Sequence, residues 1–289
     1  MKRFIDMNKT IKLALLGSAL ALTAGPVSAV DLCAGSFTKT LPDGNPVTMW
    51  GYALGGATNG VCDNTPSSPG PQLTVPDTDT TLTINLANTL PEPTSIVIPG
   101  LPMPTSGGTG PSWDFGPPGT RTDPAQRVRS FGAETALGGI MGYTFTVDRP
   151  GTFLYHSGTH PQKQVYMGLG GAVTKNFTDT PKLAYDGVPY QNEVVMFYSE
   201  IDPAHNAAVA ALDPDYTPIH YHAKWFLVNG EPYSTVCSDD GAGLDVTSGY
   251  PCINMEQTPD ILAGVAKTPT LLRFLSSAGE THEIGRAHV

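Results

Sequence analysis

The sequence carries little charge and lacks the motifs of several common enzyme classes. Charged residues make up only 15% of its 289 residues, with 16 Lys and Arg against 26 Asp and Glu. This shortage of basic residues argues against nucleic acid as a partner, because phosphate backbones are bound through Lys and Arg. There is no Gly-x-Ser-x-Gly motif and no Gly-rich phosphate loop, which argues against a serine hydrolase and a nucleotide-binding protein.

The sequence also lacks an apolar run long enough to span a membrane. Its longest, about residues 13–22, is shorter than the roughly 20 residues that a spanning helix needs. Four basic residues precede this run and Val27-Ser28-Ala29 follows it, a pattern typical of a secretory signal peptide. We therefore expect residues 1–29 to be a leader and the mature protein to be periplasmic or secreted, in a bacterium. Cleavage there changes the formal net charge from −10 to −13.

Cysteine is scarce as well. The four cysteines, Cys33, Cys62, Cys237 and Cys252, form two sequence-local pairs, and disulfides persist in exported proteins. We expect Cys33–Cys62 and Cys237–Cys252, although four cysteines allow three connectivities. None lies in a Cys-x-x-Cys or His-Cys-His arrangement, which argues against a redox dithiol, a zinc site and a blue-copper thiolate.

Glycine and proline are abundant, with 32 Gly and 27 Pro, and this indicates many short strands joined by turns. Residues 80–87 show the clearest strand pattern, because Leu82, Ile84 and Leu86 alternate with polar residues. Residues 42–45 form a good hairpin turn. The sequence therefore predicts an all-β protein with strands near residues 37–40, 47–54, 72–75, 80–87, 95–98, 127–131, 143–147 and 151–156.

A second group of strands is expected after a polar, Pro-containing connector that ends near Tyr190. Its members are predicted at about residues 193–199, 224–229 and 270–275. One short helix is expected at residues 203–212, with Asp202 as N-cap and Pro203 at the first helical position. We divide the mature chain into a first domain at residues 30–190 and an incomplete second domain at residues 191–282, because three or so strands do not complete a sandwich.

Four stretches together resemble the N-terminal part of a multicopper oxidase, the laccase-like superfamily built from cupredoxin β-sandwiches. They are Gly151–Ser157, Val165–Ala172, Ile98–Gly100 and Trp225–Tyr233. The resemblance runs from about residue 31 to 282. It implies a cupredoxin-like Greek-key β-sandwich followed by a truncated second cupredoxin-like domain, in a divergent bacterial member of the superfamily.

The resemblance also implies copper as the cofactor. In the superfamily, four His-X-His pairs hold a trinuclear copper cluster that reduces dioxygen, and a separate blue copper takes electrons from a reductant. Two of these pairs come from the first domain. The spacing has a physical reason, since residues i and i+2 of a strand point the same way and present two imidazoles on one face. Imidazole suits copper.

This sequence departs from that pattern at three of the four first-domain ligand positions. No histidine stands between Ser95 and Gly100, and Gly158 occupies the place two residues after His156. His160 is a substitute ligand only if the chain turns at Gly158, because on a continuous strand it would lie about 13 Å from His156 at roughly 3.3 Å per residue. The alternative is that both imidazoles are hydrogen-bonded at the end of the sandwich.

His220-Tyr221-His222 is the one His-X-His pattern in the chain. The resemblance gives it no role, because it precedes the second-domain strand. Both side chains would lie on one face of an extended segment, so His220 and His222 are metal-ligand candidates if a third ligand approaches. The alternative is a pair of exposed loop histidines.

Three functions are compatible with these features. The first is a fragment of an exported multicopper-oxidase-like oxidoreductase, copper-dependent in the intact parent and inactive as this truncated chain. The second is a non-catalytic exported protein that binds copper through His156 and His160 or through His220 and His222. The third is a metal-free structural cupredoxin module. A small reductant or a metal ion is the expected partner, and an oligomer would allow a neighbouring subunit to supply ligands.

Residues 283–289 have the sequence Glu-Ile-Gly-Arg-Ala-His-Val, which the common sequencing-adapter string GAGATCGGAAGAGCACACGTC encodes in frame. We therefore expect a non-native tail and a natural protein that continues beyond residue 282. Resequencing the locus checks this: clean genomic reads should show a different codon series after His282. A stop codon directly after Val289 would contradict it.

Overall fold

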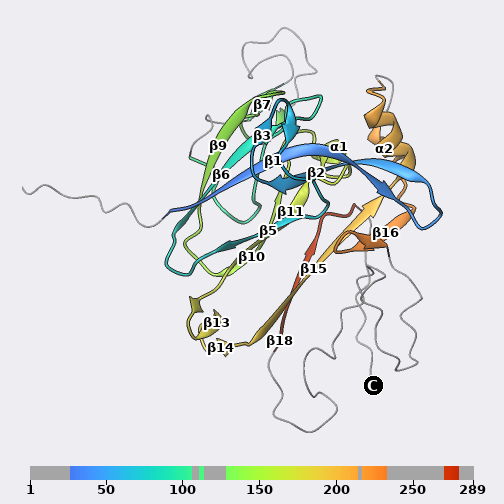
Figure 1. Ribbon diagram of the computed structural model, residues 1–289. Helices are drawn as coiled ribbons and strands as arrows, with labels where there is room; N and C mark the ends of the chain where they lie inside the picture. The colour runs from blue at the N-terminus through green and yellow to red at the C-terminus, as the bar shows by residue number, and fades with distance from the viewer. Residues whose placement is uncertain (1–26, 106–110, 114–127, 214–216, 233–269, 280–289) are drawn as a thin grey trace, which may run out of the picture.

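The computed structural model describes residues 27–105, 111–113, 128–213, 217–232 and 270–279, which form β-sheets with two short α-helices (Figure 1). The first sheet has the strand order β2-β1-β6-β9. β1 pairs antiparallel with β2 and parallel with β6, and β9 pairs antiparallel with β6. The four strands are β1 Val27–Thr40, β2 Pro46–Leu54, β6 Thr81–Asn88 and β9 Ile140–Thr146.

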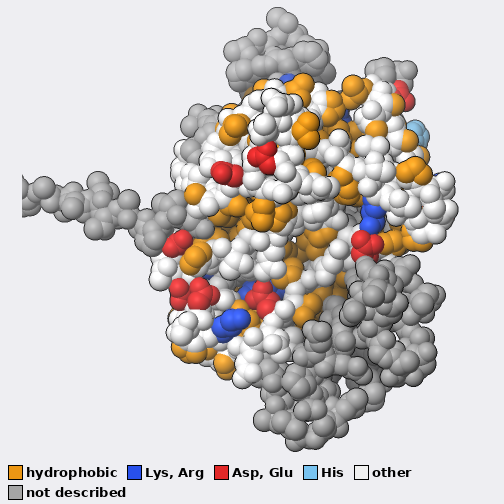
Figure 2. All heavy atoms as spheres, in the orientation of Figure 1, with side chains coloured by type: hydrophobic (Ala, Val, Ile, Leu, Met, Phe, Trp, Pro, Cys, Tyr) orange, Lys and Arg blue, Asp and Glu red, His pale blue; other side chains and the backbone are white. Residues whose placement is uncertain are grey.

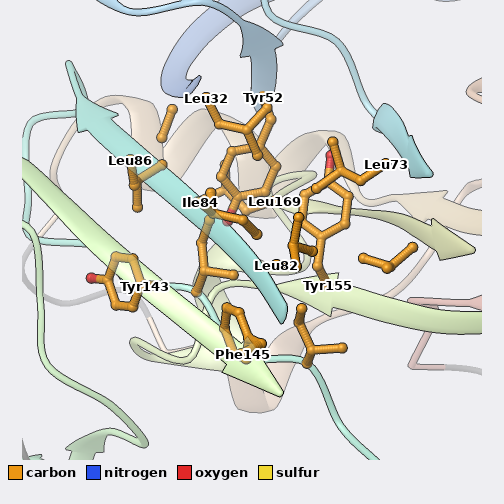
Figure 3. Packing of buried hydrophobic residues seen from close by; sticks show 14 of the residues in the cluster. Leu32, Tyr52, Leu73, Leu82, Ile84, Leu86, Tyr143, Phe145, Tyr155 and Leu169 are labelled. Atoms are coloured by element: carbon orange, nitrogen blue, oxygen red, sulfur yellow. The ribbon is translucent and has the colours of Figure 1, made fainter. Parts of the chain in front are cut away.

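The second sheet has the order β10-β11-β5 and lies against the first. Its strands are β5 Gly70–Val75, β10 Gly151–His156 and β11 Gly170–Lys175. The alternation predicted for β6 is confirmed, since Leu82, Ile84 and Leu86 are buried. Figure 3 shows these side chains in one core with Tyr143 and Phe145 of β9 and Tyr155 of β10. The predicted all-β, cupredoxin-like Greek-key sandwich is thereby confirmed.

A third sheet, of order β17-β16-β15-β18, follows in the sequence. Its first strand, β15, begins directly after the connector that we took as the domain boundary, and the division into domains stays a prediction. The predicted helix is confirmed as α2, because Asp202 caps it by accepting a 2.9 Å hydrogen bond from the Ala204 amide. The elements are β15 Asn192–Ile201, α2 Pro203–Ala210, β16 Trp225–Val228, β17 Glu231–Pro232 and β18 Thr270–Ser276.

Two expectations about the remaining segments are wrong. Residues 95–98 do not form a strand: the segment makes isolated bridges from Thr94 to Thr135 and from Val97 to His156. The connector before Tyr190 holds a small sheet of three strands. The remaining short elements are β3 Ala57–Thr58, β4 Val61–Cys62, β7 Ser112–Trp113, β8 Val128–Ser130, α1 Pro161–Gln164, β12 Thr178–Asp179, β13 Lys182–Tyr185, β14 Val188–Pro189 and the 3-10 turn η1 Pro218–His220.

One buried cation fastens the third sheet to the sandwich. Arg273 of β18 is 4% exposed, and its Nε lies 3.1 Å from Oε2 of Glu193. Its guanidinium donates to Thr152 Oγ1 of β10 at 2.8 Å and to Asn176 Oδ1 at 2.9 Å. A buried charge needs such partners, so these contacts fix where β18 lies against β10.

On the face in Figure 2, charged side chains lie scattered among polar and apolar ones, with no patch of a single sign. In the described part of the chain no helix is long and apolar enough to cross a membrane. Residues 1–26 of the expected leader lie outside the described residues. β1 begins at Val27, and its residues up to Ala29, which precede the expected cleavage point, pair with Thr81–Thr83 of β6.

The expected disulfide between Cys33 and Cys62 is present, with the two Cα atoms 5.6 Å apart. It joins β1 of the first sheet to β4, across a sequence separation of 29 residues. Cys237 and Cys252 lie outside the described residues, so their pairing stays a prediction. The cross-link stabilises the fold mainly by limiting the freedom of the unfolded chain.

Replacing Cys33 and Cys62 together by Ala should lower the free energy of unfolding by about 3 to 4 kcal/mol, the chain-entropy value for a loop of this length. Urea denaturation of native and variant protein, without reductant, measures the difference. Addition of dithiothreitol should bring the native protein towards the variant. An unchanged urea midpoint in the variant would show that this cross-link does not stabilise the fold.

Candidate functional site

His156 is the last residue of β10 and half-buried. Its backbone exchanges two hydrogen bonds with Val97, at 2.9 and 3.0 Å. Its Nδ1 lies 2.8 Å from the carbonyl oxygen of Ser157. A carbonyl can only accept, so Nδ1 carries the proton and Nε2 is the nitrogen with a lone pair. Burial lowers the pKa of His156 below its ordinary value, and the bond to Ser157 partly offsets this.

His160 follows a turn, which is the condition under which it could replace the missing ligand. It has the left-handed backbone angles φ 38° and ψ 60° and is the N-cap of α1. Its amide donates to the carbonyl of Arg129 at 2.8 Å. The residues between the two histidines are buried, and Thr159 forms a bridge with Ser130.

His160 lines a cavity of about 410 Å³ between α1 and α2, and His156 is not among the lining residues. Glu92 and Lys163 also line this cavity and form a 2.6 Å ion pair. The two candidate ligands therefore belong to different surroundings: His156 lies against Val97, and His160 lines the cavity. Their use by one ion stays a prediction.

The positions at which the resemblance places the missing ligands pack against each other. A Cβ atom on Gly158 would lie 2.7 Å from Cγ1 of Val97 and 3.0 Å from Oγ of Ser95. Real Cβ atoms essentially never come within 3.0 Å of another heavy atom. Ser95 and Val97 are themselves buried. No histidine fits at residue 158 unless this segment moves.

Buried hydroxyl groups fill the same end of the sandwich, and no sequence pattern predicts them. Ser95, Ser130 and Thr159 form a triangle of hydrogen bonds with oxygen–oxygen distances of 2.9, 3.0 and 3.1 Å. The hydroxyls of Thr94 and Ser157 lie 3.2 Å apart beside this triangle. In the sequence these are ordinary Ser and Thr residues near turns, and only the tertiary contacts distinguish them.

Gln164 is the second feature that sequence reasoning missed. Its amide oxygen accepts from Ser157 at 2.5 Å and from Thr94 at 2.8 Å. Its amide nitrogen donates to Glu92 Oε1 at 2.8 Å and to the Pro93 carbonyl at 2.9 Å. Both donors and both acceptor positions of this buried amide are thus used.

The second candidate pair does not lie on a strand. His220 ends the turn η1, and the His222 amide donates to Asp202 at 2.9 Å. Both residues are exposed. Tyr221 between them stacks on Tyr166 with 4.1 Å between ring centroids. Metal binding by His220 and His222 stays a prediction.

His205 of α2 is a fully buried histidine to which sequence reasoning gave no weight. Its Nε2 lies 3.2 Å from the Lys163 carbonyl, so it joins α2 to the end of α1. Burial lowers the pKa of His205, while the Lys163 carbonyl and the Asp202 carboxylate oppose that shift. Its ring also makes edge contacts with Tyr166 and Tyr221.

Within the described residues no three His, Cys, Asp or Glu side chains gather where they could hold a metal ion. Met167, a further soft ligand by chemistry, is fully buried in the core of the sandwich. The geometry thus offers single imidazoles and a closed hydroxyl cluster.

A sequence comparison shows which known family the sandwich resembles. The family model described as multicopper oxidase matches residues 52–176, from β2 to the residue after β11. Residues 52–176 are therefore similar to the multicopper oxidase family. No curated protein sequence matches the chain.

Solved structures of the same superfamily are similar in fold. A multicopper oxidase from Pseudomonas thermotolerans has 18% sequence identity and a TM-score of 0.49, over 72% of this chain and 42% of that chain. A multicopper oxidase from Campylobacter jejuni, described as a metallo-oxidase, has 20% identity and a TM-score of 0.46, over 71% and 36%. A copper nitrite reductase from Nitrosomonas europaea has 17% identity and a TM-score of 0.44, over 71% and 57%. The chain therefore spans less than two thirds of each of these proteins.

The superfamily implies copper, and the first-domain ligand positions of this chain do not fit it. Of the four positions only His156 offers an imidazole, with Nε2 as its one lone-pair nitrogen. One of the other positions is Gly158, which has no room for a side chain. The rest fall in the segment of residues 95–98, which consists of buried Ser, Ile and Val. A site for copper needs several imidazole or sulfur ligands.

The lowered pKa values of His156 and His205 predict a loss of stability in mild acid. A histidine held neutral contributes its full stabilisation above its ordinary pKa of about 6.5, and this is lost as the pH falls towards the lower pKa of the folded state. Urea midpoints should therefore fall from pH 7.5 to pH 5.0, and less steeply in His205→Gln. The matched control is His222→Gln, an exposed site, which should keep the native slope. Equal slopes in all three proteins would contradict the prediction.

Proposed function

We propose that this chain is the N-terminal part of an exported, copper-dependent oxidoreductase of the multicopper oxidase type. The observation that carries the proposal is the family match over residues 52–176, which covers most of the two-sheet sandwich. The signal-peptide pattern and the Cys33–Cys62 disulfide support export to the periplasm or beyond. The superfamily uses bound copper to pass single electrons from a reductant to dioxygen.

The 289-residue chain by itself should not perform that reaction. Its first-domain ligand positions supply one imidazole, and the sequence has no His-Cys-His arrangement for a blue-copper thiolate. Cys33 and Cys62 are bound in a disulfide. The oxidoreductase activity therefore belongs to the intact parent protein, where further sequence supplies the copper ligands.

One observation favours a second candidate function, a metal-free structural module. The ligand positions at Gly158 and at residues 95–97 are filled by mutual packing. In such a module the first sandwich would position another part of the parent. A non-catalytic copper-binding protein, using His156 and His160 or His220 and His222, remains the third candidate.

The purified 289-residue chain should show no oxygen consumption with a phenolic or ferrous substrate after incubation with copper, and no blue absorption band. Elemental analysis, absorption and paramagnetic resonance spectra give the copper content and type. A longer clone should include a His-Cys-His sequence and gain both the blue band and activity. Oxidation of either substrate by the short chain, above a buffer-plus-copper control, would contradict the proposal. A longer clone without copper ligands would favour the structural module.

A further inference from the structure

The end of the sandwich that carries copper ligands in the superfamily has a different construction here. Six buried side chains meet there, from the segment before residue 98, from β8 and from the turn and helix after β10. We call them the hydroxyl cluster: Thr94, Ser95, Ser130, Ser157, Thr159 and Gln164. Each is at most 1% exposed.

We propose that the hydroxyl cluster is a metal-free clasp, which closes this end of the sandwich by hydrogen bonds and leaves no room for a copper ion. The family resemblance serves here only to mark the positions that hold ligands in relatives. It does not depend on whether the parent protein is an oxidase.

The first half of the clasp joins three segments that are distant in sequence. Ser95, Ser130 and Thr159 each contribute one hydroxyl to a triangle with edges of 2.9 to 3.1 Å. These lengths are those of good O–H···O hydrogen bonds. A buried network whose members are satisfied rigidifies its surroundings, so the triangle holds β8 and the post-β10 turn to the segment before residue 98.

The second half runs through Gln164. Its amide oxygen accepts hydrogen bonds from the hydroxyls of Thr94 and Ser157. Its amide nitrogen donates to the Glu92 carboxylate and the Pro93 carbonyl. Glu92 also pairs with Lys163. Helix α1 is therefore tied to residues 92–94 by a fully used amide, and loss of this amide would remove one hydrogen-bond partner from each of four buried or half-buried groups.

Gly158 allows the two halves to meet. Val97 exchanges two backbone hydrogen bonds with His156, which sets the distance between residue 97 and the turn that follows β10. At that distance a Cβ on residue 158 would overlap Val97 and crowd Ser95. Any side chain there must displace Val97 and press on Ser95 of the clasp, and overpacking of a well-filled core is destabilising.

The chemistry of the clasp does not suit copper. Its groups are neutral hydroxyls and one amide whose protons are engaged in hydrogen bonds. Copper prefers imidazole and sulfur ligands, and His156 has only Nε2 to offer because its Nδ1 is bonded to Ser157. One nitrogen does not hold an ion against water.

Thermal denaturation of Gly158→Ala and of Gly56→Ala tests the steric part. A Cβ on Gly56 would meet only Asp63 Oδ2 at 3.5 Å, an ordinary contact. Gly158→Ala should lower the melting temperature by roughly 5 °C and Gly56→Ala by much less. If Gly158→Ala does not fold, Ser157→Ala, which removes an oxygen and adds no volume, should show the loss instead. Equal melting temperatures for native protein, Gly158→Ala and Ser157→Ala would overturn the clasp.

Copper titration tests the other part. One equivalent of Cu²⁺ should not raise the melting temperature of the native protein through binding at the clasp. Any nitrogen-coordinated copper signal should survive in His156→Ala and disappear only in the double variant His220→Ala/His222→Ala or at excess chelator. A copper signal and a raised melting temperature that are both lost in His156→Ala would overturn the proposal. Neither outcome depends on oxidase activity, which tests the proposed function separately.

Discussion

The paired hydrogen bonds between Val97 and His156 are the contact on which this end of the molecule depends. They bring the segment around residue 97 directly against the end of β10, so that Gly158 has no space for a side chain. The same approach places Ser95 beside Ser130 and Thr159. Further hydrogen bonds join this end to the two helices. Gln164 of α1 accepts from Ser157, and His205 of α2 contacts the Lys163 carbonyl.

This arrangement separates the fold of the superfamily from its chemistry. A cupredoxin-like sandwich is held by its two-sheet core, and that core needs no metal. In this chain the core is complete, with Tyr52, Tyr143 and Tyr155 among its buried side chains. The resemblance to multicopper oxidases implies copper ligands at this end of the sandwich. This chain fills the corresponding positions with hydroxyls and aliphatic groups that hydrogen-bond and pack with one another.

The third sheet is joined to the sandwich by a buried polar contact. Arg273 reaches Thr152, Asn176 and Glu193 from a strand that comes about a hundred residues later in the chain than β10 and β11. A guanidinium offers several donors in a fixed fork, so one side chain positions β18 relative to two other segments. The second group of strands thus has a defined place against the first sandwich.

Local patterns in the sequence determined much of the fold. The alternation in β6, the hairpin between β1 and β2, the cap of α2 and the pairing of Cys33 with Cys62 all involve residues close in sequence, for which periodicity and turn chemistry are informative. The residues around His156 carry the resemblance to multicopper oxidases, and the family match over residues 52–176 includes them. Tertiary structure decided the rest. Residues 95–98 look like a strand because three of the four are β-branched, yet only Val97 pairs, in an isolated bridge with His156. Thr94 meets Ser157 and Gln164 across separations of 63 and 70 residues. Such contacts leave no periodic trace in the sequence, because each partner is an ordinary polar residue until the sheets bring the segments together.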